Sequence, residues 1–246
     1  MTPTIAARFD GTEYSRAEVL SWEDRRITAA ARLLDVQVPD GDVAIRRGTL
    51  LHAKLALGPD EIAARLRRRT AAADLVARAG SQLSRRRRIS AIDLHVGAGS
   101  AEEFVTTFDR WTETSDHEAM LRACPDHYII RTDANGRQEV LETTGGSPLP
   151  SLFRIDYSDV SSLTTAPNAR FPLQIAGVAR ASDGSVIGGV RHQFRDDADG
   201  FSARLTVEFP LPTPRRMIGG HRWHLACEFS NWIEAAFGWA PFDQTR

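Results

Sequence analysis

The segment from Gly219 to Phe237 constrains the fold more than any other part of the chain. Aromatic and aliphatic side chains recur on nearly every side of the helix that its spacing predicts, so this helix of about five turns should be largely buried. Within it His224 and Glu228 are four residues apart, which places an imidazole and a carboxylate on one face. Ionisable groups inside a protein are costly unless they pair or bind a metal ion. The rest of the chain must therefore enclose this helix and account for these two side chains.

Two interpretations of His224 and Glu228 are open. In the first, the two side chains form an ion pair that satisfies itself and has only a structural role. In the second, they are two ligands of a metal ion, which requires two further ligands from elsewhere in the chain. Choosing between them needs an outline of the fold.

The bulk composition is that of an ordinary globular protein. The 246 residues suffice for one large domain, or one domain with a smaller attachment, and the net charge of −1 gives no general attraction to nucleic acid. Arginines cluster at 65–69 and 85–88, but acidic residues flank both clusters, so we expect solvated or ion-paired roles for them. No apolar run approaches the ~18 residues of a membrane span, and the N-terminus lacks a signal pattern. We expect a cytoplasmic protein with no nucleic-acid or membrane partner, and a homodimer is left open.

The N-terminal part of the chain mixes helical and strand patterns. Ser15 followed by Glu18 is a capping box that opens a helix, and Pro59 and Gly80 mark the start and end of another. Ser100 followed by Glu103 opens a third helix in the same way. The predicted elements are helix 15–34, one or two strands within 43–57, helix 60–79, strand 88–97, helix 101–110 and a short helix 117–124.

Beyond residue 125 the pattern becomes that of strands separated by turn-forming residues, until the C-terminal helix. The order of strand, helices, six strands and long helix resembles the helix-grip pattern of START and Bet v 1-like proteins. We therefore expect an α+β fold in which a curved antiparallel sheet surrounds the C-terminal helix, with a ligand cavity between them. Residues 88–246 would form this domain, and residues 1–87 a mixed N-terminal extension. The six predicted strands are 126–132, 137–144, 152–157, 171–181, 186–196 and 201–209.

The hairpin formed by the first two of these strands supplies two candidate ligands. If its loop is the four residues 133–136, Thr132 pairs with Arg137 and His127 lies directly opposite Glu142. With a tighter two-residue loop the two side chains would still be diagonal neighbours on one face. Glu139 is a competing ligand, but it points to the opposite face of its strand. In the alternative interpretation, His127 only begins the strand and Glu142 is a surface charge.

His127, Glu142, His224 and Glu228 together offer two imidazoles and two carboxylates on elements that a helix-grip fold brings face to face. This set of donors suits zinc, with manganese or iron as alternatives.

Further candidates line the predicted strands. His192 lies in the middle of a strand and is our candidate for a proton-handling catalytic residue, although a lone histidine on a strand often has a structural role. His221 is either a further imidazole of the site or a capping residue near the helix start, and we favour the second. Tyr128 and Tyr157 could hydrogen-bond a phenolic ligand.

Three segments carry a resemblance to a known family: 124–128 (Cys-Pro-Asp-His-Tyr), 139–146 (Glu-Val-Leu-Glu-Thr-Thr-Gly-Gly) and 224–231 (His-Leu-Ala-Cys-Glu-Phe-Ser-Asn). They resemble the 2,4-diacetylphloroglucinol hydrolase family, which includes phloretin hydrolase. The resemblance covers roughly residues 100–235. It implies a Bet v 1-like catalytic domain with zinc held by two histidines and two glutamates, and hydrolysis of an aryl–acyl carbon–carbon bond. The helix motif matches at His224 and Glu228, the first histidine at His127, and the spacing from His127 to Glu142 is shorter than in the family.

From the residues and the resemblance together we expect a metal-dependent hydrolase that cleaves the aryl–acyl ketone bond of an acylated polyhydroxy-aromatic or polyketide-like compound. A metal-free START-like polyketide cyclase or small-molecule binding protein is the alternative. A purely structural protein, with neither a metal nor a cavity, is the third hypothesis.

Overall fold

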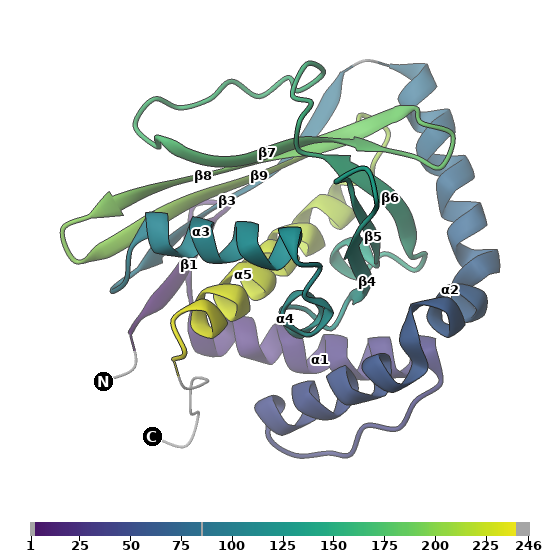
Figure 1. Ribbon diagram of the computed structural model, residues 1–246, viewed down its shortest axis with the longest axis horizontal. Helices are drawn as coiled ribbons and strands as arrows, with labels where there is room; N and C mark the ends of the chain where they lie inside the picture. The colour runs from purple at the N-terminus through teal and green to yellow at the C-terminus, as the bar shows by residue number, and fades with distance from the viewer. Residues whose placement is uncertain (1–2, 85, 240–246) are drawn as a thin grey trace.

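The computed structural model describes residues 3–84 and 86–239. Its centre is an antiparallel sheet of nine strands in the order β2-β1-β3-β9-β8-β7-β6-β5-β4, accompanied by five α-helices. Figure 1 shows β4, β5 and β6 turned steeply against the long strands β7, β8 and β9, so that the sheet bends around helix α5. The α+β class, the large antiparallel sheet and the C-terminal helix are as predicted. The strands are β1 (Ile5–Phe9), β2 (Thr12–Ser15), β3 (Arg87–Val96), β4 (His127–Thr132), β5 (Gln138–Glu142), β6 (Ser151–Asp156), β7 (Leu173–Arg180), β8 (Val186–Asp197) and β9 (Gly200–Pro210).

Local sequence signals begin most of the helices. The capping box predicted at Ser15 and Glu18 is present, and the side chain of Ser100 accepts a hydrogen bond from the backbone N–H of Glu103. The buried helix predicted near the C-terminus is α5, which begins a few residues earlier than expected, directly after Pro214. The helices are α1 (Arg16–Leu34), α2 (Val43–Leu83), α3 (Ala101–Glu113), α4 (His117–Arg122) and α5 (Arg215–Ala236), with a 3-10 turn at Thr144–Gly146.

The prediction of one or two strands within 43–57 is wrong, because these residues form the first half of α2. The β-branched residues Val43 and Ile45 suggested alternation, but Val43 is buried whereas Ile45 is 66% exposed. The buried residues Leu50, Leu51 and Lys54 instead follow helical spacing. The helix predicted at 60–79 is the second half of α2, separated from the first by a kink at Gly58.

The first strands of the chain were not expected. β1 and β2 form a hairpin whose turn is Asp10-Gly11, with positive φ at both residues. β1 then pairs with β3, so the N-terminal residues extend the same sheet that carries the later strands. The proposed boundary at residue 87 stays a prediction.

Two apolar clusters lie on opposite faces of the β4–β5 hairpin. The larger fills the inner side of the sheet and contains buried residues of α3 and α5. The smaller joins α1 and α2 to the outer face of the hairpin, where Tyr128, Ile129 and Leu141 pack. Helices α1 and α2 therefore support the hairpin from behind, while α5 faces it from within. In the described part of the chain, no helix combines the length and the hydropathy needed to cross a membrane.

Two glycines set the distance between the hairpin and α5. Gly145 has φ of +55° and lies against the backbone of Gly220 and His221, where a Cβ atom on Gly145 would stand 2.1 Å from the His221 nitrogen. A Cβ atom on Gly220 would stand 1.9 Å from the carbonyl oxygen of Gly145. Backbone meets backbone at this point, which brings the end of β5 close to the second turn of α5.

Neighbouring glycine-to-alanine substitutions in α5 should have opposite effects on stability. Gly219 has no atom within 4 Å of an added Cβ, so Gly219→Ala should raise the free energy of unfolding by about 0.5–1 kcal/mol through helix propensity. Gly220→Ala should lower it by about 1–3 kcal/mol or more, because the methyl group overlaps Gly145. Urea unfolding of both variants measures the difference. Equal effects would show that the two backbones are not in contact.

Candidate metal centre

The four predicted metal ligands lie together. His127 is the first residue of β4, Glu142 is the last of β5, and His224 and Glu228 occupy successive turns of α5, all buried. The Nε2 atom of His127 lies 3.2 Å from Nε2 of His224, 3.1 Å from Oε2 of Glu228 and 3.6 Å from Oε2 of Glu142. The Nε2 atom of His224 lies 3.6 Å from Oε2 of Glu228 and 3.7 Å from Oε2 of Glu142. We call these four residues the His–Glu cluster.

A β-bulge orients His127 toward this cluster. His127 is opposite Glu142, as predicted, but the predicted pairing in the rest of the hairpin is wrong by one residue, because Thr132 pairs with Gln138. The loop holds five residues, closed by a bond from the Asp133 N–H to the Arg137 carbonyl. The register shift between His127 and Ile129 then restores the pairing at the end of the strand. An irregularity of this kind can redirect a side chain next to a functional site.

Cys124 is a further possible metal donor that was not among the residues predicted from the sequence. Cys124, His127 and His224 form a buried group whose donor atoms could hold a metal ion. The sulfur of Cys124 lies 3.7 Å from Nδ1 of His224, whereas His127 and the two carboxylates approach Nε2 of the same ring. Cys124 and the carboxylates therefore lie on different sides of the His224 ring. The Cys-x-x-His spacing from Cys124 to His127 was a signal that could have identified it.

The charges in the cluster depend on one another. Burial alone would raise the pKa of Glu228, but the neighbouring His224 and His127 hold it well below its usual value. Burial raises the pKa of Glu142. Burial would lower the pKa of His224, but Glu142 and Glu228 raise it well above the usual value. The two carboxylates thus draw positive charge to the space between the four side chains, which either protons or a metal cation can supply.

A cavity of about 360 Å³ opens beside the cluster, and all four of its residues line it. Its size is within the range of small-molecule sites, and most of its wall is apolar. Residues of α2 and of the segments 147–151 and 210–217 also line it. The other uncharged polar or imidazole side chains that line it include Gln138, Thr144, Tyr157, His192 and His221.

His192 lies in β8 and faces this cavity, with its ring 4.8 Å from that of Phe229 between centroids. Its Nδ1 atom is buried and has no hydrogen-bond partner among the described residues. Burial lowers the pKa of His192 to about 4, so its imidazole is neutral near pH 7. A buried nitrogen without a partner is costly, and a ligand in the cavity could satisfy it.

The remaining candidates separate into those inside and outside the cavity. The capping role favoured for His221 is wrong, because α5 begins at Arg215, six residues earlier. The Nδ1 atom of His221 lies 2.9 Å from the Ser90 hydroxyl. The His221 ring stacks on the ring of His224. The hydroxyl of Tyr157 donates to Gln138 within the cavity. The hydroxyl of Tyr128 instead contacts that of Thr143, on the side of the hairpin that faces α1 and α2.

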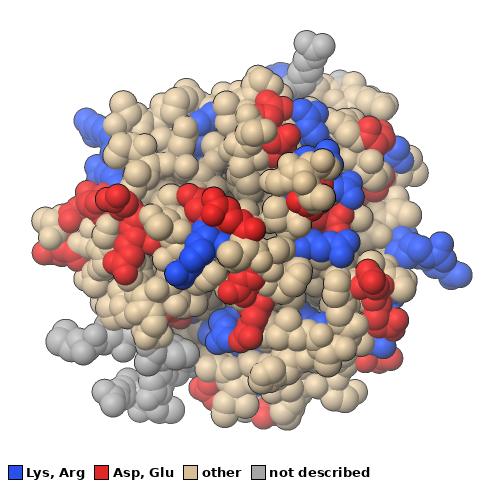
Figure 2. Space-filling model, viewed as in Figure 1, with Lys and Arg blue, Asp and Glu red and all other residues tan. Residues whose placement is uncertain are grey.

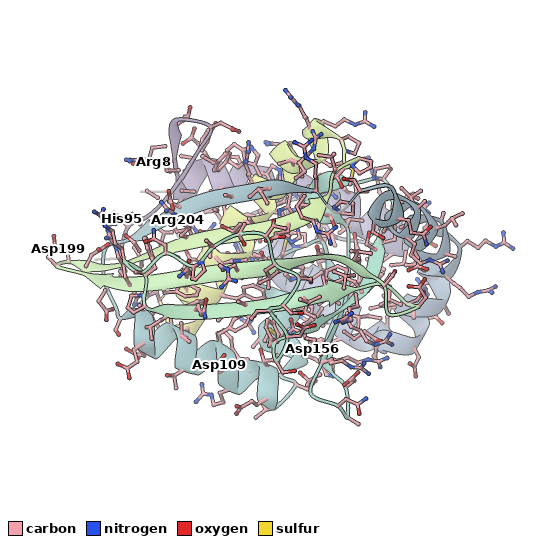
Figure 3. All side chains as sticks on the ribbon, turned by 90° about the horizontal axis from the view of Figure 1, so that it is seen from above. Arg8, His95, Asp109, Asp156, Asp199 and Arg204 are labelled. Atoms are coloured by element: carbon pink, nitrogen blue, oxygen red, sulfur yellow. The ribbon has the colours of Figure 1, made fainter. Side chains whose placement is uncertain are left out.

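Glu139 lies outside the cluster, on the opposite face of β5 from Glu142. Its carboxylate forms ion pairs with Arg131 and Arg154, each at 2.7 Å. His95 is likewise remote. Figure 3 shows it near Arg204 toward one end of the sheet, and its side chain is 63% exposed. Basic and acidic residues intermingle over much of the face shown in Figure 2, and Arg65 of the first arginine cluster pairs with Glu61.

Helix α2 fixes the residues directly before His127. The amine of Lys54 donates to the carbonyl oxygens of Cys124 at 3.3 Å and Pro125 at 2.8 Å, and it lies 5.6 Å from the centroid of the Tyr128 ring. Lys54 is the only lysine in the chain and is 1% exposed. Burial lowers its pKa from 10.5 to about 8.

The stability of the protein should therefore carry a contribution from Lys54 that changes between pH 8 and 10.5. In this window the unfolded chain binds a proton that the folded protein has released, so the free energy of unfolding rises with pH. Below pH 8 the folded protein bears the full cost of burying the protonated amine. The wild type should gain about 3 kcal/mol across the window relative to Lys54→Met. Urea unfolding of both proteins at several pH values measures this difference, in which the titrations of the cysteines and tyrosines cancel. Parallel curves would show that Lys54 keeps an ordinary pKa.

No family model and no curated protein matches the chain.

Proposed function

We propose that the chain is a zinc-dependent hydrolase that cleaves the carbon–carbon bond between an acyl group and a polyhydroxylated aromatic ring. The observation that carries the proposal is the spacing of the donor atoms in the His–Glu cluster. Zinc holds imidazole nitrogen and carboxylate oxygen at ~2.0–2.1 Å, so two ligands of a tetrahedral ion are roughly 3.3–3.4 Å apart. The five separations between donor atoms given above run from 3.1 to 3.7 Å, around that value.

The alternative set that contains Cys124 fits a single ion less well. His127 and His224 approach each other through their Nε2 atoms, whereas Cys124 faces Nδ1 of His224. One imidazole ring directs its two nitrogens apart, so an ion bound at Nε2 leaves Cys124 behind the ring. Burial also raises the pKa of the Cys124 thiol, and the thiol is a much weaker ligand than the thiolate. We therefore assign the ligands as His127, Glu142, His224 and Glu228.

The fold supports the same proposal. An antiparallel sheet bent around a C-terminal helix, with a cavity between them, is compatible with the helix-grip arrangement. The cluster lies at the wall of that cavity, where a bound molecule would meet the metal. The resemblance of the segments around His127, Glu142 and His224 to the 2,4-diacetylphloroglucinol hydrolase family is a second support.

When bound, zinc would lower the pKa of a water molecule and polarise the acyl carbonyl. The chain's own residues would do the rest. The apolar wall, including Phe229, would hold the ring and exclude bulk water. The neutral imidazole of His192 would accept a proton from a ring hydroxyl at Nδ1 and return it to the ring carbon that loses the acyl group. Tyr157, already bonded to Gln138, would orient a second ring hydroxyl.

Two glutamates on β5 provide a direct test of the ligand set. Glu142→Gln should remove most of the zinc from the purified protein, because a neutral amide is a much poorer zinc ligand than a carboxylate. Glu139→Gln is the matched control on the same strand, and it should retain zinc because the Glu139 carboxylate pairs with Arg131 and Arg154 on the opposite face of β5. Elemental analysis after purification without chelators measures both. Equal zinc loss in the two variants would overturn the assignment.

The reaction itself is tested by a screen of acylated polyhydroxy-aromatic compounds with the zinc-loaded protein. Release of a carboxylic acid is the expected result. A metal-free polyketide cyclase or binding protein is the second candidate, favoured by the apolar cavity alone. It predicts a wild-type protein without zinc that still binds such compounds.

A further inference from the structure

We propose that Asp126 and Arg26 form an outer positioning pair for the metal centre, in which Asp126 keeps the proton of His224 on Nδ1 and leaves Nε2 free to bind the ion. This inference rests on the ligand set proposed above. Arg26 lies on helix α1, so α1 would help to position a metal ligand.

Asp126 lies directly behind the His224 ring. It is fully buried, and its Oδ2 atom is 3.9 Å from Nδ1 of His224, the nitrogen that faces away from the cluster. Arg26 holds the same carboxylate with two hydrogen bonds, from Nε to Oδ2 at 2.8 Å and from Nη2 to Oδ1 at 2.6 Å. The hydroxyl of Thr143 donates to Oδ1. The carboxylate is therefore fixed in place and ionised, with its second oxygen toward the imidazole.

The surroundings of the ring decide which nitrogen carries the proton. On the Nδ1 side the nearest polar groups are the Asp126 carboxylate and the sulfur of Cys124, at 3.7 Å. An ionised carboxylate attracts an N–H and repels a lone pair, so the proton belongs on Nδ1. The lone pair on Nε2 then points toward His127, Glu142 and Glu228. Partners of this kind orient metal-binding histidines and increase their affinity for the metal.

The two histidines of the cluster differ in this respect. The Nδ1 atom of His127 faces the carbonyl oxygen of Met120 at 3.4 Å, a neutral acceptor. On the Nδ1 side, His224 faces a carboxylate where His127 faces a carbonyl, and Arg26 holds that carboxylate in place. Arg26 in turn comes from α1, about a hundred residues before Asp126 in the chain. The packing of α1 behind the hairpin thus places the Arg26 guanidinium against Asp126, the carboxylate that faces Nδ1 of His224.

The test is the zinc affinity of Asp126→Asn, measured by competition with a chromophoric chelator at a temperature where circular dichroism shows the variant to be folded. The affinity should fall about 10–100-fold, as is typical when the outer partner of a metal-binding histidine is lost. Arg26→Lys keeps the charge but loses the paired hydrogen bonds, so it should show a smaller loss. In the zinc-loaded wild type, nitrogen NMR of His224 should show the proton on Nδ1.

Glu23→Gln is the matched control. Glu23 is as buried as Asp126, lies on α1 and is held by Arg47 through two hydrogen bonds, so its loss also leaves an arginine unpaired in the interior. Stability should fall in both variants, but zinc affinity should fall only in Asp126→Asn. An unchanged affinity in Asp126→Asn, or an equal loss in Glu23→Gln, would overturn the positioning role while leaving the ligand set intact. A wild-type protein that binds no zinc would refute the metal centre and this inference with it.

Discussion

His224→Ala should reduce the bound zinc from about one ion per chain to nearly none and destabilise the fold. The substitution removes one of four donors and also one of the two imidazoles, His127 and His224, that the buried carboxylates of Glu142 and Glu228 share. Breaking a buried ion pair in this way costs ~3–5 kcal/mol, and loss of the metal's binding energy adds to it. Elemental analysis and urea unfolding of the same preparation measure the two effects.

His95→Ala serves as the control for this experiment. Its side chain is largely exposed at the edge of the molecule, so both the zinc content and the unfolding midpoint should match the wild type. If His224→Ala retained a full complement of zinc, the ion would have to lie elsewhere. If the wild type lacked zinc after purification without chelators, the metal-free binding protein would become the better hypothesis.

His192→Ala should retain zinc and lose ~10²–10⁴-fold in the rate of carboxylic-acid release, the usual contribution of a positioned proton-transfer group. The ring lines the cavity from β8, and its unpartnered Nδ1 atom is available to a bound substrate. Because the pKa of His192 is lowered to about 4, its protonation should not change the rate between pH 6 and 8. Turnover and zinc content are measured on the same sample.

The outcomes for His192 separate three roles. Full activity in the alanine variant would exclude it from the reaction and leave the proton to another group in the cavity, such as Tyr157. Loss of zinc together with activity would indicate that His192 supports the metal centre. A lower rate with intact zinc is the result that the proposed role requires, and His192→Gln should then recover substrate binding more than rate.

Much of the site followed from local patterns in the sequence. The strands from β4 to β9 were predictable because alternation and turn residues act over a few positions. The pair on α5 was predictable because residues four apart share a helix face. The opposition of His127 and Glu142 was predicted correctly from a register that is wrong over the rest of the hairpin.

The other parts depend on packing that no short segment encodes. The bulge at the start of β4 lets Tyr128 and Ile129 both face α1 and α2. The packing that stabilises this arrangement exists only in the assembled fold. The pairing of Arg26 with Asp126 joins residues far apart in the chain. In contrast, the hairpin of β1 and β2 had a local signal that was overlooked, because Asp10-Gly11 is a favoured two-residue turn.

The single buried lysine makes this protein unusually easy to follow by amine acylation. Lys54 is the one lysine side chain that an acylating reagent can modify, and its burial against the carbonyl oxygens before His127 requires α2 to move away before it reacts. Because burial lowers the pKa of Lys54, exposure restores its ordinary pKa, so rates should be compared at one fixed pH. The rate of acylation of Lys54, followed by mass spectrometry of the peptide that contains it, would then report how often the support behind the metal centre opens, without any engineered label.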